Sequence, residues 1–200
     1  MSLTFLLPFL LGIAFFVAVA RATFYRPQRR KIDDVILFVR KLEVSELELL
    51  MDVGEEWTLR HLLTEEAFRI SQLDRIRLAG EYLHRVAHNA EVIQLWMSGE
   101  HESIKYKNHP ELTEKDRLVL ELLQLATELR IYSSGALMKV WLWKALRAGR
   151  WPVTLVPEVT DLRVTCGINV VVQYRKLRET ASSLSLAYGR NYHDKLIAAL

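Results

Sequence analysis

The first 20 residues of this 200-residue chain, MSLTFLLPFLLGIAFFVAVA, carry no charged side chain. At 1.5 Å per residue, about 20 helical residues cross a hydrocarbon core of roughly 30 Å. Pro8 and Gly12 fall inside this stretch, and both residue types are tolerated in membrane-spanning helices. We therefore predict a single transmembrane anchor over residues 1–25, with the lipid bilayer as its partner.

A basic segment follows the apolar stretch and predicts its orientation. The cytoplasmic flank of a transmembrane helix is enriched in Lys and Arg, and aromatic side chains favour the headgroup level. No Lys or Arg precedes the stretch. We expect a single-pass protein of the cell membrane, with its N-terminus outside and its body in the cytoplasm. The residues expected at the membrane interface are Arg21, Phe24, Tyr25, Arg26, Arg29, Arg30 and Lys31.

A cleaved signal peptide is the alternative interpretation of the same residues. Ala18-Val19-Ala20 resembles the small-residue motif that signal peptidase cleaves. However, no basic residue precedes the apolar stretch, the stretch exceeds a typical signal core, and basic residues follow it at once. We favour a retained anchor. A buried core helix fits less well, because no polar side chain marks an outer face.

Charge is distributed unevenly along the chain. The net charge is +3, but residues 21–41 hold seven basic and two acidic side chains, so the rest of the chain is slightly acidic. A nucleic-acid-binding protein would carry a basic face on its folded domain, so we predict no nucleic-acid partner. The single cysteine, Cys166, excludes an internal disulfide framework.

After a basic juxtamembrane segment and linker over residues 26–43, the pattern becomes helical. We expect the remaining residues, 44–200, to fold as a cytoplasmic helical bundle. Ser45 and Glu48 form a capping box that predicts a short helix, which Gly54 should end. A second short helix is expected over residues 55–63.

Three longer segments, each of about 25–40 residues, supply the predicted core of the bundle. The first follows Thr64 and ends near Gly99, with an apolar stripe at Leu73, Ile76, Leu83, Val86, Ala90, Ile93 and Met97. Thr113 and Asp116 open the second segment, which is apolar on most sides from residue 118 to 146 and is therefore expected at the centre.

The third segment, from residue 159 onward, is ambiguous. Residues 164–174 are rich in β-branched side chains, which favours a strand. A helical stripe continues through them, and no second strand-like run offers a partner, so we predict a helix. Gly189 should cap it, before a short terminal helix. The expected fold is all-α: one transmembrane helix, then a bundle of three long and several short helices.

The best candidate for a metal site is Glu81-x-x-His84-x-x-x-His88-x-x-Glu91. Steps of three and four residues place these side chains along one helix face. The Glu-x-x-His motif of di-iron bundles occurs twice in each protein, and this chain contains it once. A solvated helix face therefore explains the four residues better, and we predict no metal or other cofactor.

Residues 137–151 form an aromatic and basic segment, LMKVWLWKALRAGRW. In helical projection, Trp141 shares the apolar half with Leu137 and Leu142, whereas Trp143 lies on the other half with Lys139. Trp beside Lys and Arg is typical of a helix at a lipid surface. A core helix with a solvated basic edge is the interpretation that we favour.

Neither a nucleophile motif nor a Gly-rich phosphate loop occurs in the chain, so the sequence supports no prediction of an enzyme. We expect a membrane-anchored helical interaction or scaffold protein without catalytic activity, which binds a partner protein or associates with itself. One alternative is a metal-binding helical enzyme or sensor that uses the Glu-His-His-Glu face. A further alternative is a membrane-surface-binding module that uses residues 137–151.

Overall fold

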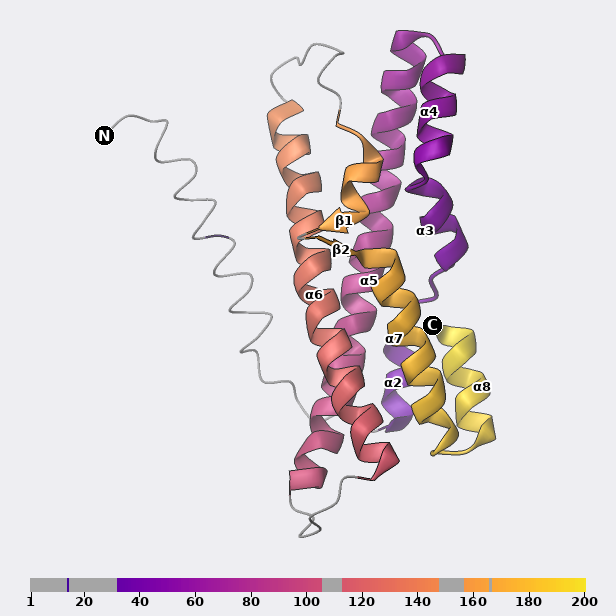
Figure 1. Cartoon of the computed structure of the whole chain (residues 1–200), viewed down its shortest axis with the longest axis vertical. Helices are drawn as coiled ribbons and strands as arrows, with labels where there is room; N and C mark the ends of the chain where they lie inside the picture. Colours follow the sequence, from indigo (N-terminus) through magenta and orange to yellow (C-terminus); the bar gives the residue numbers. More distant parts are fainter. Residues whose placement is uncertain (1–13, 15–31, 106–112, 148–156, 166) are drawn as a thin grey trace, which may run out of the picture.

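The computed structural model describes residues 32–105, 113–147, 157–165 and 167–200, together with residue 14. Helices form most of this part of the chain, which confirms the all-α prediction (Figure 1). The α-helices are α2 (Ile32–Phe38), α3 (Val44–Leu50), α4 (Val53–Leu62), α5 (Glu65–Lys105), α6 (Glu114–Arg147), α7 (Val170–Leu186) and α8 (Arg190–Ala199).

The predicted anchor, residues 1–25, and the basic interface residues that follow it lie outside the described ranges, apart from the isolated residue 14. Within those ranges, no helix combines the length and the apolar character that a membrane crossing requires. The prediction of the anchor therefore continues to depend on the sequence.

Two long antiparallel helices, α5 and α6, form the centre of the bundle (Figure 1). Helix α7 packs on α6, α8 packs on α7, and the short helices α2, α3 and α4 contact α5. The predicted apolar stripe of α5 is the core of this arrangement, because all of its residues except the half-buried Leu73 are buried. Leu122 and Leu129 of α6 and Leu177 of α7 belong to the same core.

The first residues of α5 and α6 agree with the capping signals. The Thr64 hydroxyl accepts a hydrogen bond from the backbone of Ala67 at 3.4 Å. Thr113 and Asp116 form a reciprocal capping box, in which each side chain accepts from the other residue's backbone N–H, at 3.1 and 3.3 Å. These side-chain bonds satisfy backbone donors that a helix end leaves unpaired.

The capping predictions for the short helices were wrong in detail. Helix α3 begins at Val44, with Glu43 at the N-cap position and no side-chain cap, so Ser45 lies inside the helix. Glu48 forms an ion pair with Arg175 of α7. Gly54 lies inside α4. The break falls before it, where Asp52 accepts a hydrogen bond from the backbone of Glu55 at 2.9 Å. Asp is a stronger N-cap than Gly because its carboxylate accepts such a bond.

Helix α5 continues past Gly99 to Lys105, within the polar stretch from Gly99 to Pro110 that was expected to end it. A glycine inside a helix lowers stability by roughly 0.5–1 kcal/mol relative to alanine but does not by itself end the helix. With 41 residues, α5 is longer than the sequence pattern indicated.

The prediction of a third long helix from residue 159 was wrong. Residues Val159–Leu162 form a 3-10 helix, and strand β1 (Val164–Thr165) pairs antiparallel with β2 (Ile168–Asn169). Helix α7 starts only at Val170 and has 17 residues. Gly167 has φ of 79°, which glycine adopts at little cost, so the chain reverses within the β-branched run and the run supplies its own strand partner.

Two glycine substitutions should have opposite effects on stability. Gly167→Ala should lower the free energy of unfolding by about 1 kcal/mol, because a side chain is disfavoured at positive φ. Gly99→Ala should raise it by about 0.5–1 kcal/mol, because the added methyl group meets open space on α5. Denaturation of the full chain in detergent, followed by the helical circular dichroism signal, measures both. Changes in the free energy of unfolding that have the same sign in both variants would contradict this account.

Candidate functional site

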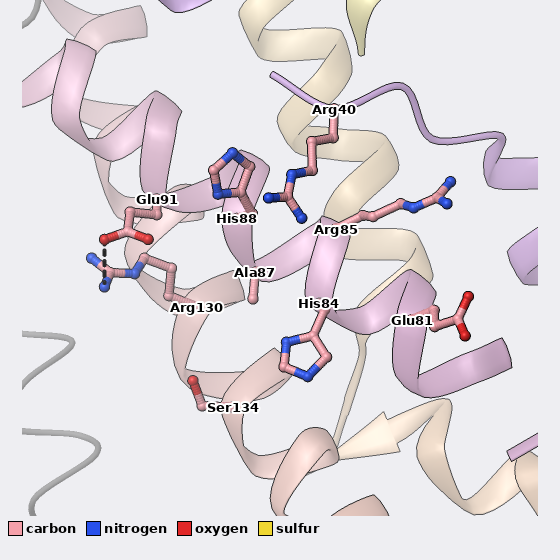
Figure 2. Close-up of a pocket in the computed structure, with 9 residues that line it drawn as sticks. All are labelled: Arg40, Glu81, His84, Arg85, Ala87, His88, Glu91, Arg130 and Ser134. Carbon is pink, nitrogen blue, oxygen red and sulfur yellow. Dashed lines mark ion pairs between the residues drawn. The ribbon is translucent and has the colours of Figure 1, made fainter. Parts of the chain in front are cut away.

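The predicted Glu-His-His-Glu face lies in a hollow of about 710 Å³ between α5, α6 and the segment that follows α2 (Figure 2). The structure therefore brings all four residues to one place. The lining residues are Arg40, Glu81, His84, Arg85, Ala87, His88, Glu91, Arg130 and Ser134.

The four side chains do not converge on a common point (Figure 2). Glu81 points away from both histidines, and the His84 and His88 rings point to opposite sides. His88 Nε2 lies 2.8 Å from the carbonyl oxygen of Phe38, to which its N–H tautomer donates. Glu91 pairs with Arg130 at 3.7 Å. Among the described residues, no group of three or more His, Cys, Asp or Glu side chains is placed to hold a metal ion.

Arginines dominate the electrostatics of the hollow. Arg40 comes from the segment after α2, Arg85 from α5 and Arg130 from α6. Arg130 is half-buried and also donates to the side chain of Gln94. Burial lowers the pKa of Arg130, and the neighbouring Glu91 partly opposes that shift. With three arginines against two glutamates, the lining has an excess of positive charge.

A buried amide, Asn89, positions one of these arginines. Asn89 is fully buried, accepts a hydrogen bond from the backbone N–H of Arg40 at 2.8 Å and donates one to the Arg40 carbonyl at 2.7 Å. It also donates to the hydroxyl of Tyr174 on α7 at 2.9 Å. Sequence reasoning missed this residue. The sequence signal that could have identified Asn89 as buried is its position three residues after Val86, next to the apolar stripe of α5.

Sequence reasoning also missed an exposed apolar stripe on α4. Val53, Trp57 and His61 follow one another at steps of four residues, so they share one side of the helix. The Trp57 side chain is 63% exposed, and the His61 ring stacks on it with a centroid separation of 4.0 Å. Such large apolar side chains on a surface are typical of protein contacts.

In the aromatic and basic segment, the burial of the two tryptophans is the reverse of what the helical projection predicted. Trp141 is 61% exposed, whereas Trp143 packs against the core. Lys139 donates to the carbonyl oxygens of Asp161 and Val164 at 3.1 and 3.3 Å. The hairpin and the 3-10 helix pack on this part of α6, and that tertiary contact determines which residues are covered. Residues 148–151 lie outside the described ranges.

Comparison with known proteins assigns no family to the chain. No family model, no curated protein and no solved structure matches it. The functional conclusion therefore depends on the contacts, burial and charges described above.

Proposed function

We propose that this chain is a membrane-anchored helical interaction or scaffold protein without catalytic activity. The observation that carries the proposal is the exposed stripe of Val53 and Trp57 on α4, called the α4 stripe below. Trp is enriched among the residues that contribute most to protein–protein binding. Burying the Trp57 ring and the Val53 side chain against a partner would remove both from water.

The surroundings of the α4 stripe fit the rim of a docking site. Arg60 pairs with Glu158 at 3.2 Å on a neighbouring surface, and its guanidinium also lies over the ring of Phe68. A polar rim around an apolar centre is the usual arrangement of transient interfaces. Side chains spaced by four residues on a short helix fit an apolar groove or a second helix on the partner.

The anchor adds a location to this proposal. The charge-free stretch at the N-terminus and the basic residues after it favour a single-pass protein with a cytoplasmic body. Confinement to a membrane raises the local concentration of tethered partners, so a small surface such as the α4 stripe can function with modest affinity.

Photo-crosslinking in native membranes tests the anchor and the docking surface together. A photo-reactive phenylalanine replaces Trp57 in one full-length variant and Val172, an exposed residue of α7, in the control variant. After carbonate extraction, we expect the intact chain in the membrane pellet. A protein adduct should form from position 57 and be lost when Val53 is also changed to Asp, because a carboxylate is costly to bury in an apolar contact.

The mass of the adduct distinguishes self-association from a different partner. An adduct of twice the chain mass identifies a second copy, and any other mass identifies a heterologous protein. Release of the chain by carbonate would overturn the anchor. Equal adducts from positions 57 and 172, or none from 57, would overturn the docking surface.

A further inference from the structure

We propose that the hollow between α5, α6 and the segment after α2 binds a phosphate-bearing anion through Arg40 and Arg130. Each guanidinium presents a planar fork of N–H donors that matches the oxygens of a phosphate. The two come from separate elements and border one cavity, whereas the Arg85 side chain points to the opposite side, as Figure 2 shows. Ser134 adds a hydroxyl from α6 to the same lining.

The carboxylates of the lining leave this positive charge incompletely balanced. Glu91 is engaged with Arg130, and Glu81 points away from Arg40 and Arg130, to the same side as Arg85 (Figure 2). Within the described part of the chain, the Arg40 guanidinium and the Ser134 hydroxyl form no hydrogen bond or ion pair, so both are available to a ligand. Arg130 is half-buried, and a second anion beside it would offset its lost hydration.

One of the two arginines is held in place before any ligand binds. The hydrogen bonds from Asn89 to both backbone groups of Arg40 fix the start of that side chain at the rim. Arg85 lies outside the proposed site, because its guanidinium is directed towards Tyr82, 5.5 Å from the ring centroid, and the Tyr82 hydroxyl bonds Glu46. Binding groups that are already ordered reduce the entropy lost on association.

The volume of the hollow, about 710 Å³, lies within the range of roughly 300–1,000 Å³ that is usual for small-molecule sites. A lone phosphate would leave most of it unfilled, so the ligand should carry an organic group. A soluble phosphate ester and the headgroup of an anionic lipid both provide this chemistry. A headgroup is within reach if the proposed anchor holds, because α2, seven residues long, spans only about 10 Å and lies between Arg40 and the basic segment.

Calorimetric titration of the full-length chain in dodecyl maltoside tests the site. The probes are glycerol 1-phosphate for the soluble source and dihexanoyl phosphatidylglycerol for the headgroup. Arg40→Gln and Arg130→Gln should each weaken binding by about fivefold or more, because each removes a charge-assisted hydrogen bond. The control Arg77→Gln changes the same charge on an exposed part of α5 that does not line the hollow, and should leave affinity unchanged.

Binding of glycerol 1-phosphate assigns a soluble ligand, and binding of the lipid alone assigns the headgroup. Both results support the site if the Arg40 and Arg130 variants weaken binding and the Arg77 variant does not. No binding of either probe at millimolar concentration, or equal weakening by all three variants, overturns it. The outcome is independent of the proposed docking surface, because Trp57 does not line the hollow and the binding assay requires no partner protein.

Discussion

Replacing Asn89 by Leu should lower the free energy of unfolding by about 2–4 kcal/mol. Leu has a similar volume, so the core around the fully buried side chain remains filled. The backbone N–H and C=O of Arg40, however, lose the partners that bond them at 2.8 and 2.7 Å. Tyr174 loses its bond from the amide and keeps the one that it donates to the Leu200 carbonyl at 3.3 Å.

The control for this prediction is the same substitution at an exposed position. Asn191 lies on the surface of α8, and Asn191→Leu should change the free energy of unfolding by no more than about 0.5 kcal/mol. Chemical denaturation of the full chain in detergent compares the two variants. Similar losses at positions 89 and 191 would show that the buried amide does not hold the segment after α2 in place.

Features encoded by neighbouring residues were predictable from the sequence. The apolar stripe of α5 repeats at helical spacing, and every member from Ile76 to Met97 is buried. The capping box of Thr113 and Asp116 depends on residues three positions apart, and it marks the start of α6. In both cases the interaction that determines the structure lies within one or two helical turns, so spacing alone identifies it.

Features that depend on distant residues were not predictable in this way. Glu48 was expected to cap a short helix, but it pairs with Arg175, which lies 127 positions away in the sequence. Asn89 bonds groups that lie 49 and 85 positions from it. A polar side chain next to an apolar stripe indicates burial, but its partners come from other elements that only the folded chain brings close.

The same distinction applies to the candidate site. The spacing from Glu81 to Glu91 predicted that four side chains share one helix face, and all four line the hollow, although they do not converge on one point. It did not indicate that Arg40 and Arg130 border the hollow from other elements. With the arginines included, an anion site is a better chemical interpretation of the hollow than a cation site, because guanidinium groups do not ligate metals.

Glu56 should be as important for stability as Asn89. Its side chain is only 4% exposed, and it joins α4 to α5 and to the 3-10 helix. It accepts hydrogen bonds from Gln72 at 2.5 Å and from the backbone N–H of Thr160 at 3.3 Å, close to the buried guanidinium of Arg75. Glu56→Leu should lower the free energy of unfolding at neutral pH by about 2–4 kcal/mol, because it leaves the Thr160 donor unpaired and removes a negative charge beside Arg75.

The variant Glu56→Gln separates the hydrogen bonds of this residue from its charge. Burial raises the pKa of Glu56 above its ordinary value of 4.5, against the opposing effects of Thr160, Gln72 and Arg75. The folded state therefore binds the proton more tightly than the unfolded chain does. The stability that this provides is fully present below pH 4.5 and is lost as pH rises through the raised pKa.

Gln keeps the acceptor oxygen and does not titrate, so Glu56→Gln should lack this decline. The free energy of unfolding of the Gln variant, relative to the wild type, should therefore increase with pH from 4.5 up to the raised pKa and level off above it. Denaturation of both proteins at a series of pH values gives the difference directly, and titrations elsewhere in the fold cancel in the subtraction. A difference that falls with pH would mean that Arg75 and the two hydrogen bonds outweigh burial, and that the ionised carboxylate stabilises the junction of α4 and α5.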